Sequence, residues 1–153
     1  MNKFTKAYIY QPHESELRWM GKTSTNFLAT GALTGGEFAL VEERSIRGIS
    51  VPLHKHDNDV ESFYIIEGEV TFFLDSKPGV RATSGAFVHI PKGIVHGFRI
   101  ESEIVRYLIL TTPHHAEFYR AITLPSKEAT VDDAVIGAAC QEYGVDFVGP
   151  LPD

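Results

Sequence analysis

Residues 48–68 read GISVPLHKHDNDVESFYIIEG, and residues 85–96 read GAFVHIPKGIVH. Together these two stretches supply three histidines and one glutamate, namely His54, His56, Glu61 and His96. Imidazole nitrogens and a carboxylate are the ligands that a borderline divalent metal prefers. The spacing therefore predicts one metal site that draws ligands from both stretches.

Strand geometry explains how these side chains could face one point. Successive side chains along a strand project to opposite faces, so His54 and His56 share a face while Lys55 lies on the other. The same rule predicts two more inward-facing sets: Glu61 with Phe63 and Ile65, and His96 with Phe98 and Ile100, opposite Arg99. A polar group among apolar neighbours is costly unless something binds it, and one metal would satisfy all four groups.

Length and composition narrow the class of protein. The chain has 153 residues, of which 43% are hydrophobic, enough for one core and short for two domains. It contains no apolar run of membrane-spanning length and no signal-peptide pattern at its start, so we expect a cytoplasmic protein. The net charge of −6, with no basic cluster, argues against nucleic acid or a membrane surface as a partner. The single cysteine, Cys140, excludes an internal disulfide and is expected to be a small core residue.

Short strands separated by turns are predicted from about residue 27 to residue 111. Val, Ile, Phe, Tyr and Thr are concentrated there, and Gly and Pro fall between the runs. This pattern favours an all-β sandwich or barrel over alternating strands and helices. The candidate strands are 38–43, 62–67, 69–74, 86–90, 97–100 and 104–110.

The remainder, residues 112–153, is predicted to be a helical extension packed outside the β core. Thr112 and Pro113 form a helix start, and this helix is expected to end near Ala121. A second helix is predicted to start at Thr130 and to stop at Gly144. No linker or repeat divides the chain, so residues 1–153 are expected to form one domain.

The two opening stretches resemble the two motifs of the cupin family in every spacing. The first motif is Gly-x5-His-x-His-x4-Glu-x6-Gly, and the second is Gly-x5-Pro-x-Gly-x2-His. The family often has an asparagine four residues after the last histidine, where this chain has Ile100, but that position is not a metal ligand. The resemblance implies a double-stranded β-helix (jelly-roll) barrel with one divalent metal inside it.

Much of the rest of the chain resembles small single-domain cupins related to quercetin 2,3-dioxygenase, chiefly over residues 27–41, 98–120 and 143–151. That likeness implies a dioxygenase acting on a flavonol-like or other enol(ate) substrate. Glu61 would be both a ligand and the base that takes the proton of the substrate hydroxyl. Two alternatives stay open: a metal enzyme that uses no dioxygen (an isomerase, lyase or hydrolase), and a binding module without catalysis.

Ligand type alone does not choose among Fe, Mn, Ni, Co, Cu and Zn as the bound ion. The expected partners are a small-molecule substrate, dioxygen and a second copy of the chain, since a dimer would cover exposed sheet edges. Three aromatic residues are candidates to contact the substrate: Phe63, Phe72 and Phe98.

Several other polar residues are expected to have structural roles. Four histidines outside the motifs are predicted to lie on the surface or at a helix start: His13, His89, His114 and His115. The run Glu42, Glu43 and Arg44 is predicted to be a solvated strand edge.

Overall fold

Two antiparallel β-sheets form the body of the protein. The computed structural model describes residues 5–153, which contain 11 strands and three helices. The strands are β1 (Glu16–Met20), β2 (Thr23–Ala29), β3 (Ala39–Ile46), β4 (Ser50–His56), β5 (Glu61–Glu67), β6 (Val70–Leu74), β7 (Val80–Ala82), β8 (Phe87–Ile90), β9 (His96–Ile100), β10 (Ile104–Thr111) and β11 (Val145–Gly149). The helices are α1 (Gly31–Thr34), α2 (Pro113–Ala121) and α3 (Asp133–Tyr143).

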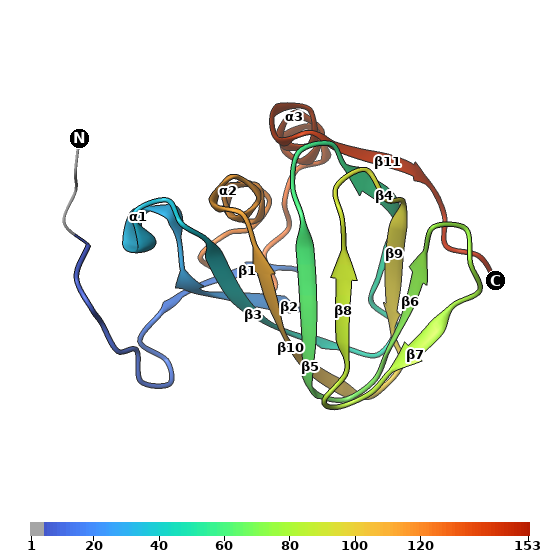
Figure 1. Cartoon of the computed structure of the whole chain (residues 1–153), viewed down its shortest axis with the longest axis horizontal. Helices are drawn as coiled ribbons and strands as arrows, with labels where there is room; N and C mark the ends of the chain where they lie inside the picture. The colour runs from blue at the N-terminus through green and yellow to red at the C-terminus, as the bar shows by residue number, and fades with distance from the viewer. Residues whose placement is uncertain (1–4) are drawn as a thin grey trace.

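The order of the strands is that of a double-stranded β-helix. One sheet has six strands in the order β1-β2-β3-β10-β5-β8, and the other has five in the order β11-β4-β9-β6-β7. Several neighbouring strands, such as β3 and β10 or β4 and β9, come from distant parts of the chain, and the two sheets face each other (Figure 1). The predicted all-β jelly-roll fold is confirmed.

The hydrophobic core fills the space between the two sheets. Phe63, Ile65 and Ile100 are almost completely buried, and the rings of Phe63 and Phe72 lie 5.0 Å apart in an edge-to-face arrangement. The burial pattern follows the strand alternation predicted from sequence, because His54 and His56 are buried on either side of a half-buried Lys55. Aromatic packing of this kind stabilises the barrel beyond the area that it buries.

Turn glycines set the register of the strands. Gly68 joins β5 to β6 at a φ of 92°, and a Cβ on it would lie 2.4 Å from the carbonyl oxygen of Ile104. Only glycine accepts both the positive φ and the close approach. The glycines at the ends of the two motifs therefore close the turns that bring the motif strands together.

The structure differs from the sequence prediction at both sides of the expected strand region. Strands β1 and β2 begin well before residue 27, and β11 adds a strand from the segment expected to be helical. The first predicted helix is confirmed, with Thr112 as its cap, whereas the second begins at Asp133 because Asp132, rather than Thr130, accepts the capping hydrogen bond. Gly144 ends that helix in the left-handed conformation, as predicted.

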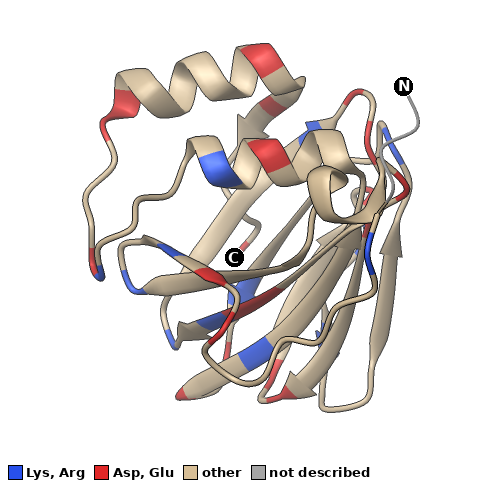
Figure 2. Cartoon of the chain, turned by 90° about the vertical axis from the view of Figure 1, so that its left-hand side faces the viewer, with Lys and Arg blue, Asp and Glu red and all other residues tan. Residues whose placement is uncertain are grey.

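Helices α2 and α3 lie together across one end of the sheets (Figures 1 and 2). Acidic and basic residues are interspersed over the elements in the view of Figure 2. Within residues 5–153, no helix combines the length and apolarity needed to cross a bilayer.

Candidate metal centre and cavity

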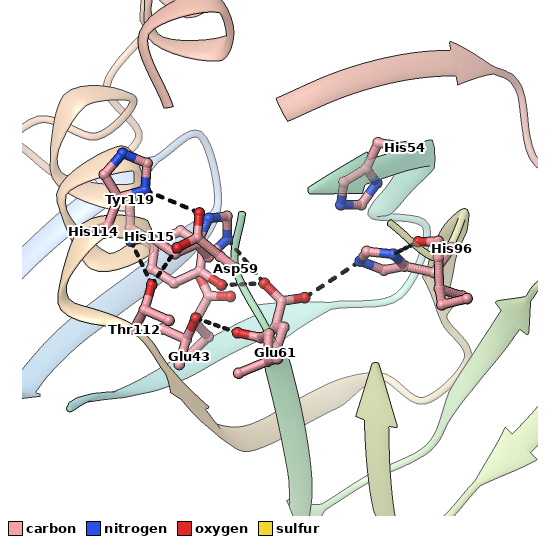
Figure 3. A network of polar contacts seen from close by, with 12 residues as sticks. Glu43, His54, Asp59, Glu61, His96, Thr112, His114, His115 and Tyr119 are labelled. Carbon is pink, nitrogen blue, oxygen red and sulfur yellow. Dashed lines mark hydrogen bonds and ion pairs between the residues drawn. The ribbon is translucent and has the colours of Figure 1, made fainter. Parts of the chain in front are cut away.

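Three histidines from two neighbouring strands converge inside the barrel. His54 and His56 come from β4, and His96, the first residue of β9, is paired with His54 across the ladder. The ring centroids of His54 and His96 are 4.2 Å apart (Figure 3). Those of His56 and His96 are 4.9 Å apart. The loop before β9 is attached to β4, because the Gly93 amide donates to the carbonyl of His56 at 2.7 Å. The bend predicted to return His96 to the other two histidines is therefore present.

Backbone carbonyls fix the orientation of two of these rings. The Nδ1 atom of His54 is 2.8 Å from the Pro52 carbonyl, and that of His96 is 2.9 Å from the Ile94 carbonyl. A carbonyl oxygen only accepts, so each Nδ1 carries the proton and each Nε2 keeps a free lone pair. Such second contacts are what orient metal-binding histidines.

Burial keeps His54 and His56 neutral. It lowers the pKa of His54 to about 4, with further lowering by His96, and it lowers the pKa of His56 to about 3. A neutral imidazole is the form that binds a metal. At neutral pH the ring nitrogens are therefore available as ligands.

Glu61, the first residue of β5, lies beside the histidines and is held by two residues of α2. Its Oε2 atom accepts hydrogen bonds from His115 Nε2 at 3.0 Å and from the Tyr119 hydroxyl at 2.5 Å. Its Oε1 atom lies 3.5 Å from His96 Nε2 (Figure 3). Burial alone raises the pKa of Glu61, but the hydrogen bond from His115 and the proximity of His96 outweigh it, so the pKa lies well below its usual value. Glu61 is therefore a carboxylate.

His115 lies at a helix start, one of the two places predicted for the histidines outside the motifs, but it is buried beside the metal-site residues. His115 is in the first turn of α2, as expected, but it is only 1% exposed. The centroid of its ring lies 4.1 Å from that of the His56 ring. Tyr119 follows it by four residues, so both side chains lie on one helix face. Helix α2 packs outside the barrel, as expected, and this face of it also reaches Glu61.

A buried aspartate attaches the start of α2 to the segment before β5. Asp59 is 2% exposed; it accepts from the Thr112 hydroxyl at 2.5 Å, and its other oxygen lies 3.0 Å from His114 Nδ1. Thr112 in turn caps α2 by accepting from the His115 amide. These hydrogen bonds of Asp59 and Thr112 position His115 and Tyr119 over Glu61, which is two residues beyond Asp59.

The donor atoms form two overlapping groups that could hold a metal ion. In each group the possible ligand atoms lie within 4.8 Å of one another: the first is His54, His56 and His96, and the second is His56, Glu61 and His115. Among the described residues, His96 Nε2 is buried without a hydrogen-bond partner, although it faces the other donors. A buried lone pair aimed at two further imidazoles fits a divalent cation.

A cavity of about 530 Å³ opens from this centre. That volume lies within the range of about 300–1,000 Å³ that holds drug-sized ligands. Its wall is mostly apolar, and the rings of Phe63 and Phe98 line it, 5.5 Å apart. Phe72 packs against both rings in the core.

Glu43 is a second carboxyl group in the cavity wall, which corrects the prediction of a solvated strand edge. Strand β3 lies between β2 and β10 and is not an edge. Glu42 does point outward, where it pairs with Arg106 at 2.8 Å, but Glu43 lines the cavity. Strand alternation, applied from Val41, would have indicated the inward direction of Glu43.

Comparisons with known proteins agree with this architecture. Residues 44–111 match the family described as Cupin domain. Quercetin 2,3-dioxygenase of Bacillus subtilis is 26% identical over 119 residues, which cover 77% of this chain. The match spans only 35% of the length of that relative.

Solved structures with the same fold include an RmlC-like cupin from Shewanella frigidimarina. It is 18% identical, with a TM-score of 0.63, and the match covers 74% of this chain and 96% of that one. The polyketide cyclase RemF from Streptomyces resistomycificus is 20% identical, with a TM-score of 0.62, over 71% of this chain and 80% of that one. At these identities the likeness concerns the fold alone. The two sheets and the motif spacing agree with the match of residues 44–111 to the Cupin domain family.

Proposed function

We propose that the protein is a metal-dependent dioxygenase for a flavonol-like or other enol(ate) small molecule. The observation that carries this proposal is a pair of overlapping ligand groups beside an apolar cavity with room for a planar ligand. One group is His54, His56 and His96, and the other is His56, Glu61 and His115. The likeness to a quercetin 2,3-dioxygenase supports the choice of substrate class. In this proposal His54, His56, Glu61 and His96 are the ligands of one divalent metal.

The residues of the chain have separate tasks in this mechanism. A divalent metal supplies Lewis acidity toward the substrate oxygens and, if it is redox-active, a means of engaging dioxygen. Glu61 is ionised and takes the proton of the substrate hydroxyl, while His115 and Tyr119 hold its second oxygen in place. Phe63 and Phe98 bind the rings of the substrate and exclude water.

The charge of the cavity supports a substrate of low charge. Three carboxyl groups line the cavity, those of Glu43, Glu61 and Asp133. Over residues 5–153, Lys22 is the only lysine or arginine in the lining, and its side chain is 59% exposed and paired with Glu128. A small dianion would find no buried cation apart from the metal, whereas a neutral aromatic molecule matches the apolar wall.

Metal content tests the site. The wild-type protein, purified without added metal, is compared with His96→Ala and with the matched control His89→Ala, whose ring is on the exposed side of β8. Loss of one ligand should lower occupancy at least tenfold in His96→Ala and leave it unchanged in His89→Ala. Equal occupancy in all three proteins would rule out these ligands.

Oxygen consumption tests the reaction. Apo protein is reconstituted in turn with Fe, Mn, Ni, Co, Cu and Zn, and oxygen uptake is followed with flavonols and related enols. Uptake that depends on the metal and disappears in His96→Ala supports the proposal. No uptake with any metal would remove the dioxygenase function.

One observation favours a second candidate, a metal enzyme that moves protons without dioxygen. The Glu61, His115 and Tyr119 cluster is a connected set of proton-bearing groups, and such sets serve isomerases, cyclases and lyases as well. This candidate would be preferred if the purified protein held only zinc and consumed no oxygen.

We also propose that the chain forms a homodimer through the outer face of the six-stranded sheet. Tyr64, Phe87 and Leu110 are all about half exposed or more on that sheet. An interface would cover them. Light scattering of the wild type and of a Phe87→Glu variant measures the mass, and a monomeric wild type would contradict this assembly.

A further inference from the structure

A row of polar side chains crosses the inner face of the six-stranded sheet. Thr25 on β2, Glu43 on β3 and Tyr107 on β10 are direct cross-strand partners, and all three line the cavity. The Thr25 hydroxyl donates to Glu43 Oε2 at 2.8 Å, and the Tyr107 hydroxyl donates to Oε1 at 3.2 Å. Each carboxyl oxygen thus has one protein donor and keeps a further lone pair for a ligand.

The row lies on a different level of the cavity from the metal-binding nitrogens. Tyr107 pairs with Ile65 on β5, four residues along the strand from Glu61, so the backbones are about 13 Å apart along the strand at about 3.3 Å per residue. The level between them is apolar, with Val41, Ile109 and Phe63 side by side. One extended ligand could contact both polar levels and lay its rings on the apolar level.

The electrostatics of the row leave Glu43 able to hydrogen-bond in two ways. Burial raises the pKa of Glu43 to about 7; Thr25 and Tyr107 oppose this, and the Glu61 carboxylate adds to it. Burial also keeps the Tyr107 hydroxyl protonated, because its pKa lies well above the usual value. A ligand hydroxyl both donates and accepts, so it matches Glu43 whether or not the carboxyl group carries a proton. An anionic ligand group would match only the protonated form.

We propose that Glu43, held by Thr25 and Tyr107, binds a ring hydroxyl of the substrate and makes the cavity select planar, polyhydroxylated aromatic molecules. The inference rests on the proposed flavonol-like substrate class and specifies it. A purely structural role explains the row less well, because a half-buried carboxyl group with a raised pKa is unfavourable and an apolar residue would pack against Val41 and Ile109 without that penalty. Groups kept in a cavity at such a penalty are candidates for ligand binding.

The test compares two flavonols that share the metal-binding hydroxyl and carbonyl but differ in ring hydroxyls: quercetin and 3-hydroxyflavone. Dissociation constants are measured by calorimetry without dioxygen, in protein loaded with Zn²⁺ alone, so that turnover does not enter. A hydrogen bond to the Glu43 carboxyl group should make quercetin bind about tenfold more tightly in the wild type. That preference should fall to about onefold in Glu43→Leu. In Glu43→Gln it should fall by a factor of at least three, since an amide oxygen is a weaker acceptor.

Glu42→Gln is the matched control, because Glu42 is the neighbouring carboxylate on the outer face of the same strand. It should keep the full preference. An unchanged preference in both Glu43 variants, or no preference in the wild type, would overturn the inference. If Glu43→Leu does not fold, Glu43→Gln decides the result.

The outcome is separable from that of the proposed function. A preference that depends on Glu43, together with no oxygen uptake under any metal, would support the inference and contradict the dioxygenase. Oxygen uptake, together with a preference for quercetin that does not change in the Glu43 variants, would support the dioxygenase and contradict the inference. If neither flavonol bound, the substrate class would be wrong and both proposals would fall.

Discussion

Replacing Tyr119 with phenylalanine should weaken metal binding without removing a ligand. The Tyr119 hydroxyl donates to Glu61 Oε2 at 2.5 Å, and both groups are buried. Such a bond to an ionised group contributes about 1.5–3 kcal/mol. If Glu61 then samples other rotamers, the same free energy is lost from metal binding, which corresponds to about a 10–100-fold rise in the dissociation constant.

The measurement is a competition titration of the apo protein with Zn²⁺ and, separately, with Co²⁺. Tyr64→Phe is the matched control, because Tyr64 lies on the same strand as Glu61 but is 47% exposed on the outer face. This variant should bind both metals like the wild type. Affinities for Tyr119→Phe within twofold of the wild type would show that α2 does not position Glu61, and the reasoning would fail.

Three further changes are expected to alter stability in defined ways. Gly68→Ala should lower the free energy of unfolding by about 2 kcal/mol or more, since it combines a φ of 92° with the contact to Ile104. The control Gly21→Ala, at a φ of 58° with nothing within 4 Å of the added Cβ, should lower it by only about 1 kcal/mol. Equal decreases for the two variants in urea unfolding would contradict the steric clash at Gly68. Asp59→Asn should lower the free energy of unfolding by about 1–2 kcal/mol and increase hydrogen exchange at the start of α2. Asp57→Asn is the control, because Asp57 is exposed. Unchanged exchange in Asp59→Asn would mean that the Asp59 hydrogen bonds do not hold the start of α2. The pKa of Glu43 is raised in the fold to about 7 from 4.5, so its protonated form stabilises the fold below pH 4.5 and this contribution is lost as the pH rises to 7. Glu43→Gln should therefore become more stable relative to the wild type between pH 4.5 and pH 7. A difference in the free energy of unfolding that does not depend on pH would mean that the surroundings of Glu43, which include Glu61, Tyr107 and Tyr119, do not raise its pKa.

Much of the metal centre follows from local sequence. Strand alternation is enforced by backbone geometry, so the inward direction of His54 and His56 and the outward direction of Lys55 could be predicted without knowing what lay across the barrel. The cap at Thr112 is likewise a short-range interaction, and the helix it starts has the predicted bounds.

The contacts of α2 with the site could not be predicted in the same way. His115 reaches Glu61 across a sequence separation of 54 residues, and that contact depends on how α2 docks on the barrel. A pair such as His115 and Tyr119, four residues apart, indicates a shared helix face, but it does not say whether the face points inward. Glu43 was missed for a different reason, because its charged neighbours Glu42 and Arg44 hide the alternation of β3.

Strand β11 has a consequence for how the protein is made. Phe147 pairs with His54, and Val145 pairs with His56, so the strand with two of the proposed ligands gains a neighbour from about 90 residues later in the chain. During synthesis, residues 48–96 leave the ribosome well before residues 145–149 are available to pair. The nascent barrel must therefore expose β4 as an open edge for some seconds, at about 5–20 residues per second. An unpaired edge strand is a template for edge-to-edge aggregation, and pairing with β11 removes it from β4.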